Sequence, residues 1–263
     1  MPEIRCFYEK YRNSQFYRSI NNSESLSLEK IKNFMTNYDA QIREICNNLN
    51  KYRFNNNLAN NLIDKDTLNE LHPIFKQHYL PHITKGNGNC LFNMISISLI
   101  GNESLHGVLR ALTVYTMVKN KTEFLSIKQR DINANNNDVE IINKFNSILY
   151  EAKTDKFWCN EYHLLAISTF LNSDLYIYGT FFNRTTGSLY QNASTVEELE
   201  HIFNRSIRTG AHLIYRPLNC LLSDHNSMPI YGFFSSIRKH YTSIIPKSNR
   251  PPIFKPINCI IAL

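Results

Sequence analysis

A cysteine follows a glycine-containing loop in the sequence KGNGNCLFNMIS. Gly86 and Gly88 permit backbone conformations that other residues avoid, so the loop can turn its N–H groups toward one point. Asn89 is a favoured helix cap, and Cys90 then begins an apolar segment that predicts a helix over residues 90–100. A helix N-terminus favours the thiolate, and inward N–H groups can hold an oxyanion. The segment therefore predicts a nucleophile, Cys90, beside its own oxyanion hole.

A nucleophilic cysteine needs a base, for which histidine is the usual side chain. His240 begins the alternating sequence HYTSII, which predicts a strand with one buried face, and a ring at its start can point across a cleft. His78 and His82 are four residues apart, but Pro81 interrupts a helix there, so no paired metal site is predicted. Seven other histidines have structural interpretations: His72, His78, His82, His106, His163, His201 and His212.

Four motifs, in this order, resemble those of the ovarian tumour (OTU) family of papain-like cysteine peptidases, which are mainly deubiquitinases. GNGNCLFNMIS resembles the signature G-D-G-N-C-L-F-R-A-I/L-S. ESLHGVLRALTVYTM resembles the helix that follows, with its H-x-x-L-R pattern at His106, Leu109 and Arg110. WCNEYHLLAISTFLNSDLYIY resembles the W-G-G-x-x-E-L-x-A-L-A segment and the strand after it, and HYTSI resembles the closing H-Y-[ND]-S-V.

The resemblance implies an α+β fold of the papain-like, OTU type, with a mixed β-sheet packed between helices and a helical N-terminal extension. It makes Cys90 the nucleophile and His240 the general base and later the general acid. The backbone of Asn87, Gly88, Asn89 and Cys90 becomes the oxyanion hole. The implied reaction is hydrolysis of isopeptide bonds at the C-terminus of ubiquitin or polyubiquitin, or of a ubiquitin-like protein, and no metal or cofactor is implied.

Two departures from the family pattern concern the group that orients the histidine. The aspartate of G-D-G-N-C is Asn87 here, and the position two residues after His240, usually Asp or Asn, is Thr242. Thr242 can accept a hydrogen bond from the imidazole but cannot stabilise an imidazolium as a carboxylate does. Thr242 is therefore the first candidate for the third catalytic residue. Asn87 is the second candidate, with a role in the oxyanion hole as its alternative.

The leading prediction for the function is a thiol-dependent deubiquitinase. One alternative is a catalytically impaired ubiquitin-binding module of the same fold, which the two departures favour. The other is a peptidase that processes a different protein substrate. Trp158, the only tryptophan, precedes a predicted helix and is expected to pack beneath the site rather than touch substrate.

Three zones divide the chain: a helical N-terminal extension over 1–75, the catalytic domain over 76–246 and a proline-rich basic tail over 247–263. Apolar residues recur every three or four positions through 27–50, which predicts an amphipathic helix in the first zone. The sequence HPIFKQHYLPH, residues 72–82, reads as a strand-breaking separator. The second zone predicts helices and then strands, at 90–100, 103–119, 138–151, 160–171, 174–179, 211–217 and 240–246.

Composition and charge narrow the class of protein. The chain of 263 residues is 43% hydrophobic and carries a net charge of +7, with five basic and no acidic residues among the last 29. A solvated basic end is the simplest interpretation, and the lack of a basic-aromatic stripe argues against nucleic acid. No secretion signal or membrane span is seen, and the six cysteines form no C-x-x-C pair, so an intracellular, cytoplasmic protein with reduced thiols is expected.

Overall fold

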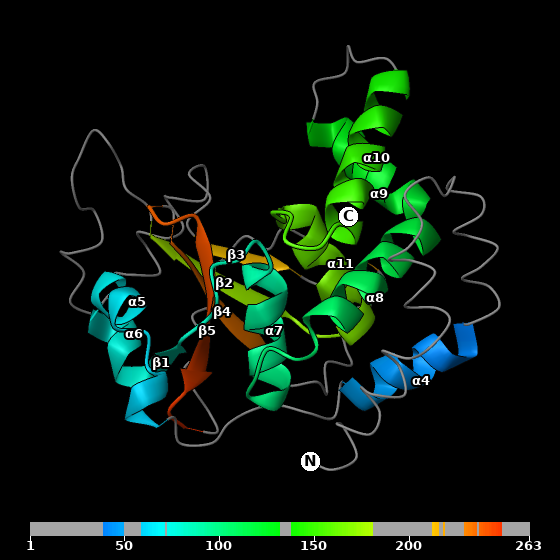
Figure 1. The fold of residues 1–263 in the computed structure, drawn as a ribbon. Coiled ribbons are helices and arrows are strands. Elements are labelled where there is room, and N and C mark those ends of the chain that lie inside the picture. Colours follow the sequence, from blue (N-terminus) through cyan, green and yellow to red (C-terminus); the bar gives the residue numbers. More distant parts are fainter. Residues whose placement is uncertain are drawn as a thin grey trace, which may run out of the picture.

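A mixed five-stranded β-sheet lies between two groups of helices (Figure 1). The structure is a computed structural model. It describes residues 39–49, 59–71, 73–131, 138–180, 212–215, 218, 229–235 and 237–248. The predicted α+β fold, with a mixed sheet packed between helices, is confirmed.

The sheet has the strand order β1-β5-β4-β2-β3. Only β2 and β4 pair in parallel, whereas β1 with β5, β5 with β4, and β2 with β3 are antiparallel. The pairing of β1 with β5 matches His82 with Ser243, which brings the start of the Cys90 loop to the strand of His240. The strands are β1 (Tyr79–His82), β2 (Leu175–Thr180), β3 (His212–Tyr215), β4 (Ile230–Ser235) and β5 (His240–Pro246).

The helices cover both faces of the sheet. α5 and α6 pack against β1 on one side, whereas α7 packs against β5 and β4 on the other, with α8 and α11 behind it (Figure 1). The helices are α4 (Asp39–Leu49), α5 (Lys65–Glu70), α6 (Pro73–His78), α7 (Cys90–Ile100), α8 (His106–Lys119), α9 (Lys121–Asp131), α10 (Asp138–Lys153) and α11 (Glu161–Leu171), with a short 3-10 turn at Asn60–Leu62.

α7 is the central helix, and every one of its residues is buried. A helix that is apolar on all sides belongs in a core, which is what the uninterrupted apolar sequence after Cys90 specifies. β4 approaches it closely because residue 232 is glycine: a Cβ there would lie 2.3 Å from the sulfur of Met94. This packing fixes the N-terminal end of α7, and therefore Cys90, against the sheet.

Most of the predicted helices and strands are confirmed, with ends shifted by a few residues. The prediction that residues 72–82 interrupt strands is wrong for their last four residues. Tyr79–His82 form the edge strand β1. Pro81 is tolerated there since an edge strand can spare a backbone donor. The sequence also missed β4 and α9. Of the helix predicted over 27–50, only residues 39–49 are described, and the tail beyond residue 248 lies outside the described residues.

Described parts of the N-terminal zone contact the rest of the protein. Ile45 and Leu49 of α4 are 2% exposed, lie in the same hydrophobic core as α7 and α8, and α4 packs on α11. Thr67 of α5 is fully buried and contacts β5. The division near residue 75 stays a prediction. α4 buries apolar side chains, and α5 buries Thr67, against the elements that follow. Within the described ranges, no helix is long and apolar enough to cross a bilayer.

Candidate active site

Cys90 lies at the N-terminus of α7 and is 3% exposed. Backbone N–H groups of Tyr241, Leu91 and Cys90 itself are close enough to its sulfur to influence the pKa of the thiol. Burial raises the pKa of the thiol, while these N–H groups and the positive charge of Arg110 lower it, and the net direction is upward. Cys90 is therefore a thiol at rest, and the neighbouring N–H groups favour its thiolate once it forms.

The loop before Cys90 is held by side chains rather than by a helix cap. Asn87 Oδ1 accepts from the backbone N–H of Asn89 (3.2 Å) and from Nδ2 of Asn93 (3.3 Å). Gly88 has a φ of +81°, and a Cβ at this position would lie 1.9 Å from the carbonyl oxygen of Lys156. Glycine is therefore required at residue 88 by both conformation and space.

Asn89 is not the side-chain cap that the sequence predicts, because its side chain faces the core. Its Oδ1 accepts from Nε of Arg110 (2.8 Å) and from the backbone N–H of Lys156 (3.0 Å), and its Nδ2 donates to Asp155 (2.8 Å). These bonds bring the loop against residues 155–156 and leave the start of α7 to be fixed by Arg110.

Arg110, in α8, is the main support of this loop, and it is only 4% exposed. Besides Asn89, its guanidinium donates to the carbonyl of Gly88 (3.2 Å) and its plane lies over the ring of Phe92. It also ties the loop to the end of α10 and the segment after it. There it donates to the carbonyls of Glu151 (3.0 Å), Ala152 (3.1 Å) and Phe157 (2.7 Å).

The oxyanion hole predicted over Asn87 to Cys90 needs N–H groups that point to a common site. The N–H of Asn89 is already bonded to Asn87 Oδ1, so it faces into the loop. The N–H of Cys90 adjoins its own sulfur, and an oxyanion hole needs such a donor beside the carbonyl oxygen of a substrate bonded to that sulfur. The oxyanion hole therefore stays a prediction, in which the backbone N–H of Cys90 is the best-placed donor. Asn87 stabilises the loop through its bonds to Asn89 and Asn93.

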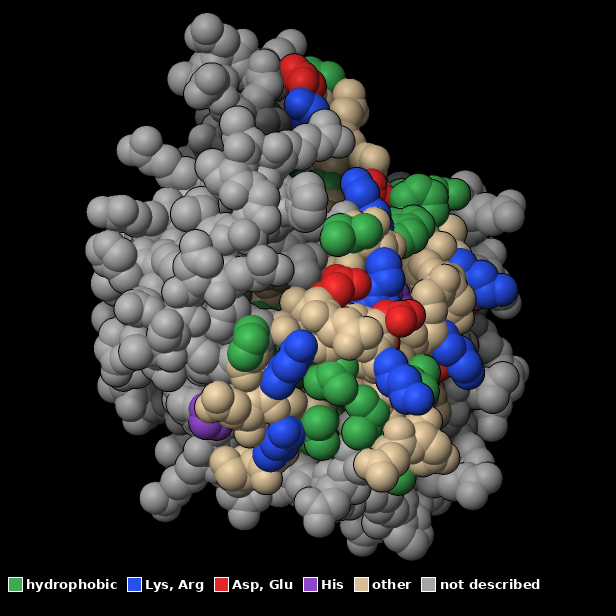
Figure 2. Space-filling view, turned by 90° about the vertical axis from the view of Figure 1, so that its left-hand side faces the viewer, with side chains coloured by type: hydrophobic (Ala, Val, Ile, Leu, Met, Phe, Trp, Pro, Cys, Tyr) green, Lys and Arg blue, Asp and Glu red, His purple; other side chains and the backbone are tan. Residues whose placement is uncertain are grey.

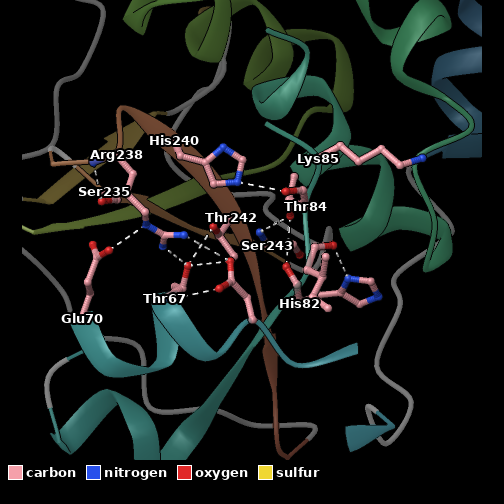
Figure 3. Close-up of polar contacts among 12 residues, drawn as sticks. Thr67, Glu70, His82, Thr84, Lys85, Ser235, Arg238, His240, Thr242 and Ser243 are labelled. Carbon is pink, nitrogen blue, oxygen red and sulfur yellow. Dashed lines mark hydrogen bonds and ion pairs between the residues drawn. The ribbon is translucent and has the colours of Figure 1, made fainter. Parts of the chain in front are cut away.

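His240, at the start of β5, is 8% exposed. Its Nε2 lies 3.0 Å from the main-chain carbonyl of Thr84 (Figure 3). A Cβ at Gly86 would lie 3.7 Å from its Nδ1. The ring edge that carries Nδ1 therefore faces the loop leading to Cys90. α7 packs against β5, and the backbone N–H of Tyr241, the residue after His240, lowers the pKa of Cys90, so the two candidate residues lie on neighbouring elements.

Thr242 was expected to orient His240, but it has a different partner. Its hydroxyl lies 3.0 Å from that of Thr67 in α5 (Figure 3). Thr67 also donates to Asp64 (2.9 Å) and accepts from Arg238 (2.5 Å), whose Nε donates to Glu70 (2.7 Å). Thr242 thus joins a polar network that fixes α5 to β5, and Asn87 is likewise committed to Asn89 and Asn93.

The charge state of His240 follows from its surroundings. Burial lowers the pKa of its imidazole, and the nearby charge of Arg238 lowers it further. The Thr84 carbonyl, Asp64 and Glu103 act in the opposite direction, without reversing the net effect. At neutral pH His240 is therefore a neutral imidazole and Cys90 a neutral thiol, which are the charge states that general-base catalysis by the histidine requires.

A cleft of about 770 Å³ opens beside His240. Thr84, Gly86 and His240 line it from the site, and Trp158 lines it from the segment before α11. Trp158 is 51% exposed, so the expectation that it packs beneath the site is wrong. Its exposed ring instead offers a contact surface at the cleft. The remaining lining residues are Asn60, Asn61, Ile63, Asp64, Lys65, Asp66, Ile83 and Arg238.

Other described histidines have structural contacts. His163 is fully buried at the start of α11, where Nδ1 accepts the N–H of Asn160 (2.8 Å) and Nε2 donates to the carbonyl of Ile148 (2.9 Å). Burial lowers the pKa of His163 to about 4. Among the described residues, no group of three or more His, Cys, Asp or Glu side chains could hold a metal ion.

The described basic side chains do not form a stripe on the face that carries α5 and α6. Figure 2 shows Lys and Arg spread among hydrophobic, acidic and neutral polar side chains on this face. A surface that binds nucleic acid would gather its positive charge along one track. The distribution on this face gives no support to nucleic-acid binding.

A protein-family model matches the segment that contains Cys90. Residues 81–180 match the family model described as "Vertnin, OTU domain". The resemblance to the OTU family is confirmed. The matched residues include three of the four OTU motifs, whereas His240 lies beyond them. No curated protein sequence matches the chain.

Solved OTU domains resemble the structure at low sequence identity. The OTU domain of OTUD1 aligns with a TM-score of 0.43 and 18% identity, covering 64% of this chain and 85% of that one. The viral OTU domain protease from Dera Ghazi Khan virus gives 0.41 and 14%, covering 65% and 83%. The corresponding protease from Farallon virus gives 0.42 and 10%, covering 68% and 90%. At this similarity they carry no argument about activity.

Sequence reasoning missed two contributors to the candidate site. Arg110 was noted only as part of the H-x-x-L-R motif, although an arginine inside the apolar run VLRALTV is a signal for a buried, multiply bonded guanidinium. Thr84 contributes a main-chain carbonyl. A main-chain group leaves no signal in the side-chain sequence, so only the geometry could reveal it.

The charge states predict the pH dependence of the site. Because the pKa of His240 is lowered from its usual 6.5, kcat/KM should rise with pH to a half-maximum below 6.5. Arg238→Gln removes a charge that lowers this pKa, so it should move the half-maximum to higher pH. Lys239→Gln, the same charge change one residue away, is the control. A pH–rate profile of each protein checks this, and a shift in both variants would contradict the assignment to Arg238.

Proposed function

We propose that the protein is a thiol-dependent deubiquitinase in which Cys90 is the nucleophile and His240 the general base. One observation carries the proposal. The Cys90 sulfur lies among backbone N–H groups at the start of α7, while the Nδ1 edge of His240 faces the loop that leads to it. The OTU-domain match over residues 81–180 supports the substrate class, because that family acts mainly on ubiquitin conjugates.

The proposed reaction has two halves. In the first, Nδ1 of His240 takes the thiol proton while the Cys90 sulfur bonds to the isopeptide carbonyl carbon. The C–N bond then breaks, the imidazolium gives its proton to the leaving lysine amine, and a thioester remains. In the second half, water loses a proton to His240 and attacks the thioester. The C–S bond breaks, and the proton returns to the sulfur.

The cleft beside His240 suits a polypeptide on the leaving-group side. Exposed Trp158 and Ile83 offer apolar contacts, and the open cleft runs from them to His240. The imidazole must reach the departing amine to protonate it, so the chain that carries the lysine would lie along this cleft.

One observation favours a catalytically impaired ubiquitin-binding module instead. Burial raises the pKa of Cys90, and the described contacts of His240 include no carboxylate partner that would stabilise an imidazolium. Such a module would bind ubiquitin through the same surface but turn over slowly. The two candidates differ in rate rather than in binding.

The test is to incubate the protein with a panel of di-ubiquitins and with ubiquitin carrying a thiol-reactive C-terminal group. The deubiquitinase predicts cleavage of at least one linkage and a covalent adduct. Ubiquitin binding without either product would support the impaired module. Failure to bind, label or cleave would reject both, and a peptide-library screen would then address the processing peptidase.

A further inference from the structure

The contact of His240 with Thr84 determines which ring nitrogen carries the proton. Nε2 lies 3.0 Å from the Thr84 carbonyl oxygen, and both residues are buried, at 8% and 6% exposure. A carbonyl oxygen can only accept a hydrogen bond. Neutral His240 must therefore hold its proton on Nε2, which leaves Nδ1 as the bare nitrogen.

Thr84 is itself fixed by the edge of the sheet. Its hydroxyl donates to the carbonyl of His82 (3.1 Å), and the backbone N–H of Ser243 donates to the same hydroxyl (3.4 Å) (Figure 3). His82 and Ser243 are the paired residues at the end of the β1–β5 ladder. The Thr84 side chain thus bridges both strands and sets the direction of its own carbonyl.

The hydroxyl of Thr242 bonds to α5, and the acceptor of the imidazole N–H is the carbonyl of Thr84. The hydroxyl of Thr67 gives its single proton to Asp64, so its oxygen can only accept. The hydroxyl of Thr242, 3.0 Å away, must then donate to Thr67. Since Nε2 of His240 already lies against Thr84, Thr242 acts on α5 rather than on the imidazole.

We propose that the main-chain carbonyl of Thr84 is the positioning group for His240, the role for which the sequence predicts Thr242 and then Asn87. The proposal rests on the proposed function only in naming His240 as the base. The carbonyl fixes the ring with Nε2–H inward and Nδ1 toward the Gly86 loop. Because a carbonyl carries no full charge, it orients the imidazole without strongly stabilising the imidazolium.

The direct test is the tautomer of His240, measured by NMR of protein labelled with ¹⁵N-histidine. His240→Gln identifies the signal by its loss. The expected result at alkaline pH is a protonated Nε2 and an unprotonated Nδ1. A protonated Nδ1, or a rapidly exchanging mixture of the two forms, would overturn the proposal. This readout needs neither substrate nor turnover.

Two hydroxyl deletions then separate Thr84 from Thr242. Thr84→Val keeps the shape but loses both hydroxyl bonds, so the carbonyl is less well directed; kcat should fall about 5-fold with little change in KM, the scale of one net hydrogen bond. Thr84→Ser, which keeps the hydroxyl, should restore kcat. Thr242→Val should leave the Nε2–H tautomer in place. A tautomer change in Thr242→Val, with none in Thr84→Val, would assign the role to Thr242 instead.

The proposal and the proposed function can fail separately. A fixed Nε2–H tautomer in a protein that cleaves no ubiquitin conjugate would reject the deubiquitinase and retain the positioning role of Thr84. Cleavage by a protein whose His240 carries its proton on Nδ1 would retain the enzyme and reject the role of Thr84.

Discussion

Cys90→Ala is expected to abolish both the adduct with thiol-reactive ubiquitin and the cleavage of di-ubiquitin. The sulfur is the only atom of this side chain that can form the thioester, and the methyl group of alanine cannot replace it. The substitution removes one buried sulfur, at a cost of about 1 kcal/mol, so the fold should survive. Mass spectrometry of the probe reaction and gel assays of di-ubiquitin measure the two losses, and thermal melting verifies the fold.

Cys159→Ala is the matched control. Cys159 is half-buried, and its sulfur lies 3.8 Å from Nη1 of Arg110, the arginine that supports the loop before Cys90. Burial raises the pKa of Cys159 to about 12, so almost none is thiolate at pH 8. The control should therefore label and cleave like the original protein. Labelling that persists in Cys90→Ala but disappears in Cys159→Ala would move the nucleophile to residue 159.

The fold was predictable where the apolar pattern was continuous. α7 follows from the unbroken apolar sequence after Cys90, and β5 follows from the alternation that begins at His240. β4 was not predicted because Gly232 interrupts its run of apolar residues. The same glycine leaves the space that the side chain of Met94 occupies. β1 escaped because Pro81 suggests a break, and the sequence does not show that a strand will lie at the edge of its sheet.

Sequence patterns could nominate side chains for the candidate site but not its main-chain groups. The glycine loop and the motif order pointed to Cys90 and His240, which the structure places on neighbouring elements. The third group was sought at Thr242 because the family pattern puts it two residues after the histidine. Alternation along β5 turns His240 and Thr242 to the same face of the strand. At Thr242 this face is covered by Thr67 of α5. That contact joins segments far apart in the sequence, so the local pattern around His240 does not predict it.

Arg110→Met should cost the protein about 3–5 kcal/mol of unfolding free energy, because it removes the donor for several buried acceptors at once. The carbonyls of Gly88, Glu151, Ala152 and Phe157 would lose their bonds to the guanidinium. Methionine fills a similar volume, so the loss is mainly one of hydrogen bonds rather than of packing. Chemical denaturation monitored by circular dichroism measures the difference.

The same substitution should lower kcat by about 100-fold, since freeing Gly88 and Asn89 lets the loop before Cys90 shift by about an ångström. Arg110→Lys keeps the charge but lacks the planar guanidinium, so its kcat should lie between that of the original protein and that of Arg110→Met. Lys144→Met, which breaks only an exposed ion pair with Glu140, should cost about 0.5 kcal/mol or less and leave kcat in place. If Arg110→Met melted like Lys144→Met while losing kcat, the guanidinium would serve the loop without stabilising the fold. If it lost stability but kept kcat, the loop before Cys90 would be held in place without Arg110.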